Sequence, residues 1–242
     1  MSQKHILHSL KKYMFTEIKD NINNDKKFNL DVYNRKEKQK GPEIKIKPDT
    51  FFSPEYKDKF FWCFYIIKFG LEKFNDVNNK HFKIETSFKM NIAEELKQND
   101  DLLKKYKIKR CEVETELIND TKISISTVFA MCLVYKINII FNNKRTFIKL
   151  FGNPEDTHNI HVIKKDENDR LGVINNVNKS YIENIIENFY EQINYKKPIL
   201  SISSYKLKEI IDISEKLKIS LVSDLGKKKT KSVLYKEILS KV

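Results

Sequence analysis

The stretch Phe60-Phe61-Trp62-Cys63-Phe64-Tyr65-Ile66-Ile67 holds the single tryptophan of the chain and its densest run of aromatic side chains. The rest of the sequence is polar, since charged residues make up 33% and hydrophobic residues only 40% of the 242 positions. Burial of large aromatic side chains is a major favourable term in folding. We therefore expect the core to be organised around residues 60–67, with Cys63 in their middle.

The net charge of +13 is placed unevenly along the chain. Residues 1–50 carry 12 Lys/Arg against 7 Asp/Glu, residues 196–242 carry 12 against 5, and the centre carries 22 against 21. Gly41-Pro42, Lys47-Pro48 and Pro198 interrupt the pattern near these changes. We predict a basic N-terminal arm at 1–50, a core at 51–195 and a basic helical module at 196–242.

Cysteine usage and hydropathy favour an intracellular protein without a membrane partner. The three cysteines are odd in number and lack paired spacing, and no apolar segment follows the first residues as in a signal peptide. The longest apolar run is far shorter than the roughly 20 residues that cross a bilayer. No Walker loop, dinucleotide turn or Cys/His ligand spacing occurs, so we expect no cofactor and no metal.

The order of expected elements is typical of an α+β fold. Two helix assignments remain open near the aromatic run: one helix from Ser53 to about Phe74, or a short turn at 54–58 followed by a new helix near Phe61. Further expected helices cover 84–105, with a break at Asn99-Asp100, then 128–135 capped by Ser126, and 182–193 capped by Ser180. Expected strands cover 137–141, 146–151, 158–164 and 171–175, with a turn at 142–144.

A helix that carries Cys63, an apolar helix and then strands with His161 follow the order of papain-like folds. Among these, the chain resembles the ovarian-tumour (OTU)-type deubiquitinases over roughly residues 55–175. The resemblance implies a cysteine peptidase with a small antiparallel sheet, Cys63 as nucleophile, His161 as general base and His158 as a fallback base. Its substrate would be a ubiquitin-like protein or another polypeptide.

The chain departs from that family at two places. Phe60, Phe61 and Trp62 stand where the family has Asp-Gly-Asn before the cysteine, and Ile163 stands where it has Asn or Asp after the histidine. An orienting group would have to come from elsewhere, for example from Asp156, Asn159, Asp166 or Asn168. Two alternatives stay open for each site residue: Cys63 is a nucleophile or a buried core cysteine, and His161 is a base or a structural strand-end histidine.

The segment 203–241 resembles the SAP and Rho N-terminal helix-extended-helix modules, which bind DNA or RNA. Two short apolar-faced helices, the first capped by Ser203 or Ser204 and the second by Thr230, flank a Gly226-Lys-Lys-Lys229 turn. The resemblance and the charge together indicate phosphate contacts, and the residues expected to make them are Lys227, Lys228, Lys229 and Lys231.

Two functions therefore follow from the sequence. The first is a cysteine peptidase with a nucleic-acid-binding tail, which hydrolyses an isopeptide or peptide bond. The second is a non-enzymatic nucleic-acid-binding or virion-packaging protein on a degenerate protease-like scaffold. Composition and this combination of modules also suggest a protein of a large DNA virus, located in host cytoplasm, a viral factory or the virion.

Overall fold

The computed structural model describes residues 51–223 and 226–242, so the expected N-terminal arm lies outside the described residues. By their contacts, residues 46–242 group into one compact unit. The helices are α2 (Lys59–Phe69), α3 (Leu71–Asn75), α4 (His81–Gln98), α5 (Asp100–Lys105), α6 (Arg110–Asn119), α7 (Ile125–Tyr135), α8 (Lys179–Asn188), α9 (Leu207–Lys216) and α10 (Lys231–Leu239). The strands are β1 (Phe51–Phe52), β2 (Asn138–Asn143), β3 (Thr146–Phe151), β4 (Ile160–Lys165), β5 (Leu171–Ile174) and β6 (Tyr190–Glu191).

The strands form one sheet in the order β1-β5-β4-β2-β3-β6. Mixed helix and sheet confirm the α+β class, but the expectation of an antiparallel sheet is wrong, because β2 pairs with β4 and β3 with β6 in parallel. β3 ends where β2 begins, and the chain then crosses to the other side of β2 before it forms β4. The crossing loop is held by Asn138, whose amide donates to the carbonyl oxygens of Asn153 and Asp156 at 2.7 and 2.6 Å.

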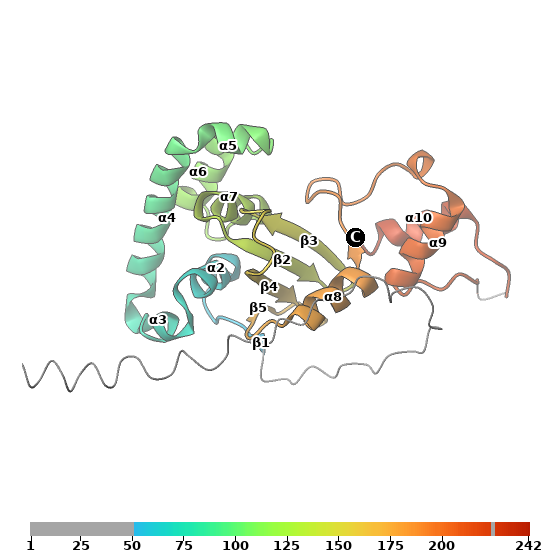
Figure 1. Cartoon of the computed structure of the whole chain (residues 1–242), viewed down its shortest axis with the longest axis horizontal. Helices are drawn as coiled ribbons and strands as arrows, with labels where there is room; N and C mark the ends of the chain where they lie inside the picture. Colours follow the sequence, from blue (N-terminus) through green and yellow to red (C-terminus); the bar gives the residue numbers. More distant parts are fainter. Residues whose placement is uncertain (1–50, 224–225) are drawn as a thin grey trace, which may run out of the picture. The chain divides into compact units, whose positions relative to one another are not determined.

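Helices cover both faces of the sheet (Figure 1). Alternation along β2 sends Ile139 and Phe141 toward α2 and α7, and Ile140 toward α8. The larger cluster therefore lies on the α2 side and contains the aromatic run, in which Phe61, Trp62, Cys63 and Phe64 are all fully buried. The expectation that this run organises the core is confirmed.

Helix α2 begins at Lys59, and so the assignment of one helix from Ser53 is wrong. Asp58 is the N-cap, and its carboxylate accepts from the backbone N–H of Phe61 at 3.2 Å. The Ser53 hydroxyl instead donates to the Leu171 carbonyl at 2.7 Å, which ties the chain beside β5. The sequence pattern left two helix starts open, and tertiary contacts selected the later one.

Several predicted elements match and others shift at their ends. The β2–β3 hairpin, the strands β4 and β5, the helix break at Asn99-Asp100 and the Thr230 cap are confirmed. The cap of α7 is Ser124 instead of Ser126, and that of α8 is Asn178 instead of Ser180. α8 also ends at Asn188, before the predicted Ile193, because the following residues form β6 beside β3.

A buried ion network joins α2 to α4. Lys89 Nζ lies 2.6 Å from Asp58 Oδ2 and 2.8 Å from Glu85 Oε1, and Trp62 Nε1 donates to Glu85 Oε2 at 3.1 Å. The same Asp58 oxygen accepts from the backbone N–H of Ile123 at 3.2 Å. Burial raises the pKa of Asp58, which the bonds to Lys89 offset only in part. Burial alone would lower the pKa of Lys89, but its two carboxylate partners outweigh that and raise it.

Replacement of Lys89 by methionine should leave the buried Asp58 carboxylate without its counter-ion. We expect the free energy of unfolding at pH 7 to fall by about 3–5 kcal/mol, measured by urea denaturation with Trp62 fluorescence as the signal. Lys83→Met, on the exposed side of the same helix, is the matched control and should change stability little. The double variant Asp58→Asn/Lys89→Met should lose less than the sum of the single variants, and simple additivity would contradict the network.

Candidate functional site

Cys63 lies inside the core and not at the start of its helix. It is the fifth residue of α2, 0% of it is exposed, and the buried aromatic side chains of Phe61, Trp62 and Phe64 are its neighbours in the helix. Burial raises the pKa of its thiol, so the thiolate is disfavoured. An activated peptidase cysteine needs the opposite environment, a partly exposed position with a lowered pKa.

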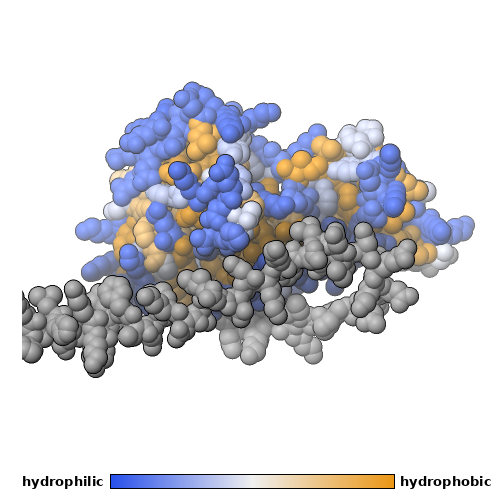
Figure 2. All heavy atoms as spheres, viewed as in Figure 1, coloured by the Kyte–Doolittle hydropathy of each residue, from blue (hydrophilic) through white to orange (hydrophobic). Residues whose placement is uncertain are grey.

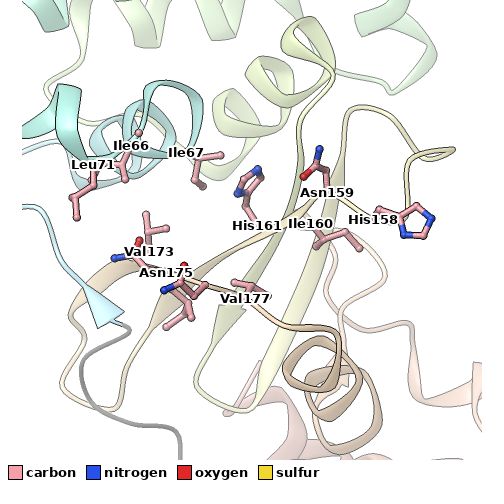
Figure 3. Close-up of a pocket in the computed structure, with 13 residues that line it drawn as sticks. Ile66, Ile67, Leu71, His158, Asn159, Ile160, His161, Val173, Asn175 and Val177 are labelled. Atoms are coloured by element: carbon pink, nitrogen blue, oxygen red, sulfur yellow. The ribbon is translucent and has the colours of Figure 1, made fainter. Parts of the chain in front are cut away.

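His161 lines a separate hollow beside the C-terminal half of α2. The cavity has a volume of about 320 Å³ and includes Ile66, Ile67, Gly70 and Leu71 in its wall, but not Cys63. The ring of His161 projects from β4 toward Ile67, whereas the ring of His158 points away (Figure 3). The positive end of the α2 dipole, which would favour a thiolate, is at the other end of this helix.

Of the candidate orienting residues Asn159 and Asp166, only Asn159 lies beside His161. Asn159 lines the same hollow as His161, and its backbone N–H donates to Asp156 at 3.2 Å. Asp166 follows the last residue of β4, five positions beyond His161, which is roughly 16 Å along an extended strand. Its carboxylate accepts from the Arg170 side chain at 2.8 Å. Asp166 is therefore out of reach of the His161 ring.

Two asparagines that sequence reasoning missed, Asn175 and Asn176, complete the hollow around His161. They follow β5, and only the pairing of β4 with β5 brings them beside the histidine. Among the described residues, no hydrogen bond joins His161 to Cys63 or to a carboxylate, and no cluster of three or more His, Cys, Asp or Glu could hold a metal ion. The catalytic roles of Cys63 and His161 thus remain a prediction from the sequence without geometric support.

The C-terminal helical pair has a hydrophobic cluster of its own. Ile210, Ile213, Leu217, Leu234 and Ile238 are buried where α9 meets α10. The first helix is capped at Lys206 instead of Ser203 or Ser204, which lie in a short 3₁₀ turn, because the Glu209 carboxylate reaches back to the Lys206 backbone N–H. The cluster also includes Tyr190 of β6, so the pair packs against the end of the sheet.

The link between these helices folds back on itself. Val222 and Lys228 form an isolated antiparallel bridge, Ser223 N–H donates to the Lys227 carbonyl at 2.9 Å, and Gly226 adopts a φ of 72° that favours glycine. Lys227 and Lys228 are exposed at this turn. The turn predicted from the Gly-Lys run is confirmed.

The four predicted phosphate-binding lysines differ in their surroundings. Lys229 Nζ lies 2.8 Å from Glu237 Oε2, and only 15% of its side chain is exposed. Lys231 is partly exposed at the first position of α10, a helix with no acidic residue in its first turn. Lys227, Lys228 and Lys231 thus remain available to a ligand, while the charge of Lys229 is satisfied inside the module.

Comparison with known proteins adds no family to these observations. No family model matches the chain, and neither the curated proteins nor the solved structures contain a match. Among the described helices none combines the length and the apolarity that a membrane span requires. In the view of Figure 2 hydrophilic residues cover much of the described surface, with smaller hydrophobic groups between them.

Thiol reactivity reports directly on the environment of Cys63. Cys63 and Cys132 are buried, and burial raises the pKa of both, whereas Cys111 is exposed. At pH 7 one thiol of the three should react rapidly with iodoacetamide, peptide mapping should locate it at Cys111, and the other two should react only in denaturant. Preferential labelling of Cys63 near pH 6 would instead support an activated nucleophile.

Burial also lowers the pKa of His161, so the neutral ring is favoured in the folded state. The unfolded chain then binds more protons, and the free energy of unfolding should decrease as pH falls through about 6.5 toward the folded pKa. The slope that this single group contributes is at most about 1.4 kcal/mol per pH unit. Urea denaturation of the wild type and of His161→Asn between about pH 5 and 7 gives the free energy of unfolding against pH for each protein. The difference between the two slopes is the contribution of His161, and equal slopes would exclude a shifted pKa of His161.

Proposed function

We propose that the protein binds nucleic acid through the C-terminal helical pair, α9 and α10, with the sugar–phosphate backbone as the contacted part. The observation that supports this most directly is the exposed turn of Lys227 and Lys228 ahead of the α10 N-terminus. A lysine ammonium provides a compact charge with little geometric demand, which suits phosphate oxygens.

The placement of charge supports the same function. Residues 196–242 carry 12 Lys/Arg against 5 Asp/Glu, a larger excess than in the rest of the chain. One of the five acids, Glu237, is paired with Lys229, and another, Glu209, caps α9. These two acids therefore serve the internal structure of the module, and the exposed Lys227 and Lys228 of the link keep their charge for a ligand.

The module presents its lysines on a fixed scaffold. Val222 and Lys228 are paired across the link, and Lys229 N–H donates to the Leu221 carbonyl at 2.9 Å. Leu234 and Ile238 anchor α10 to α9. A turn held in this way loses less conformational entropy on binding than a flexible tail would.

Phosphate contacts alone carry no sequence information, because every nucleotide offers the same backbone. We accordingly expect binding with little sequence preference to DNA or RNA. Peptide-bond hydrolysis is not part of this proposal, because the Cys63 thiol is enclosed by core side chains and its pKa is raised.

The double variant Lys227→Gln/Lys228→Gln tests the proposal, and the variant Lys229→Gln is its control. For duplex DNA each lost phosphate contact flattens the slope of log K against log salt by about 0.9, so the double variant should flatten it by about 2. Lys229→Gln should leave the slope nearly unchanged and lower the thermal midpoint instead, since it breaks the pair with Glu237. Fluorescence anisotropy with labelled DNA and RNA measures the first effect, and thermal denaturation the second.

An unchanged affinity and slope in the double variant would contradict the proposal, provided that its circular dichroism matches the wild type. Glu237→Gln provides a further control, because it frees Lys229 without removal of a lysine. This variant should bind nucleic acid at least as tightly as the wild type.

A further inference from the structure

A second basic surface lies where the sheet meets the C-terminal helices. It is a groove with a volume of about 460 Å³, formed by the β2–β3 turn, the β4–β5 turn and the end of α9. The residues that line it include two acids, Asp166 and Glu167. The cationic lining residues are Lys144, Arg145, Lys164, Lys165, Lys218 and Lys241.

The groove keeps an excess of positive charge after its internal pairs are considered. Lys144 and Lys165 share one carboxylate, that of Asp169, at 3.2 and 3.1 Å. Lys164, Lys218 and Lys241 form no ion pair with any residue in 51–223 or 226–242.

Neither acid in the lining offsets that excess fully. The Asp166 carboxylate is occupied by the Arg170 side chain, with Nε at 2.8 Å from one of its oxygens. Glu167 is exposed and makes no salt bridge among the described residues. An anionic ligand in the groove would therefore meet more cationic side chains than carboxylates, with Glu167 as the one lining carboxylate that no salt bridge among the described residues compensates.

Arg145 fixes the geometry of the groove, because its guanidinium contacts two backbone carbonyls and one aromatic ring. Its Nε donates to the Lys216 carbonyl at 3.1 Å, and its Nη2 donates to the Asn188 carbonyl at 3.2 Å. The guanidinium also lies 4.5 Å from the ring centroid of Phe189. These contacts hold the C-terminal end of α9 beside the β2–β3 turn, so both walls of the groove exist before a ligand binds.

We propose that this groove is a second phosphate-binding surface for the same nucleic acid that the C-terminal helices bind. The inference rests on the proposed function and extends it from the module to the core. The shared C-terminal module favours nucleic acid over an acidic peptide, because residues that directly follow α9 and α10, namely Leu217, Lys218 and Lys241, supply one wall of the groove. Isolated lysine charges on both walls suit a backbone that carries one charge per nucleotide.

This assignment changes an expectation drawn from composition. Residues 51–195 are nearly neutral in sum, with 22 Lys/Arg against 21 Asp/Glu, which suggested that binding is confined to residues 196–242. The fold brings Lys144, Lys164 and Lys165 together at one end of the central strands β2 and β4. Together with Lys218 and Lys241 from the C-terminal segment, these side chains give the groove a local excess of positive charge, although the core sums close to zero.

The test compares two variants of the full chain with the same net charge. The groove variant is Lys164→Gln/Lys218→Gln/Lys241→Gln, which removes the three unpaired lysines. The control variant is Lys83→Gln/Lys97→Gln/Lys122→Gln, which removes three exposed lysines that form no ion pair among the described residues and lie outside the groove. Anisotropy with a labelled duplex of about 30 base pairs, and with single strands of equal length, is measured between about 50 and 300 mM salt.

For the duplex, we expect the groove variant to flatten the salt slope by about 2 to 3 and to weaken binding at the lowest salt by roughly tenfold or more. The control variant should change both far less. Combination with Lys227→Gln/Lys228→Gln should reduce the slope further, because the two surfaces contact one ligand. Equal melting curves for the groove variant and the wild type exclude an effect through misfolding.

Equal slopes for the groove and control variants would overturn this inference and leave the proposed function intact, if the turn variant still weakens binding. Full affinity in both the groove and the turn variants would overturn both proposals. Binding of labelled polyglutamate that depends on the groove lysines, without any effect on nucleic acid, would overturn the inference in favour of an acidic-peptide surface.

Discussion

The buried charge network around Asp58 is the constraint on which the helical layer depends. One carboxylate caps α2, accepts from the backbone at Ile123 and pairs with Lys89. It thereby fixes the start of the aromatic helix against α4 and against the chain that leads into α7. A buried ion pair of this kind adds little net stability compared with apolar side chains, but loss of one partner is costly. It therefore specifies one arrangement of three segments more than it strengthens the core.

The same arrangement explains why Cys63 lies where it does. With Asp58 as the cap, Cys63 lies in the second turn of α2. Its thiol is part of the core cluster that packs between α2, the sheet and α4. His161 faces the opposite end of this helix. The resemblance to cysteine peptidases was carried by element order, and element order does not fix which helix end meets which strand end. Apolar and polar side chains both line the hollow around His161, and burial lowers the pKa of its ring.

The C-terminal helices illustrate how structure divides equivalent residues. Lys227, Lys228 and Lys229 are adjacent and identical in the sequence, yet Lys229 pairs with Glu237 across the module and the other two face solvent. Lys229 is the one of the three whose ammonium reaches Glu237 of α10, while its backbone N–H donates to the Leu221 carbonyl at 2.9 Å. The cations of the groove differ in the same way. Arg145 donates to backbone carbonyls at the ends of α9 and α8, whereas the nearby lysines line the groove.

The sequence by itself determined the elements whose signals are local. Apolar periodicity gave the central helices, the β2–β3 hairpin and the two C-terminal helices, and the aromatic run was correctly placed in the core. Of the predicted helix caps, only the one at Thr230 was correct. Only the tertiary structure decided the parallel pairing of β2 with β4, the cap at Asp58, the burial of Cys63 and the gathering of lysines at one end of the central strands. Each of these depends on contacts between residues far apart in the chain, such as Asp58 with Lys89 and Asn138 with the crossing loop. Local propensity does not encode such contacts, because their free energy exists only once the segments have packed together.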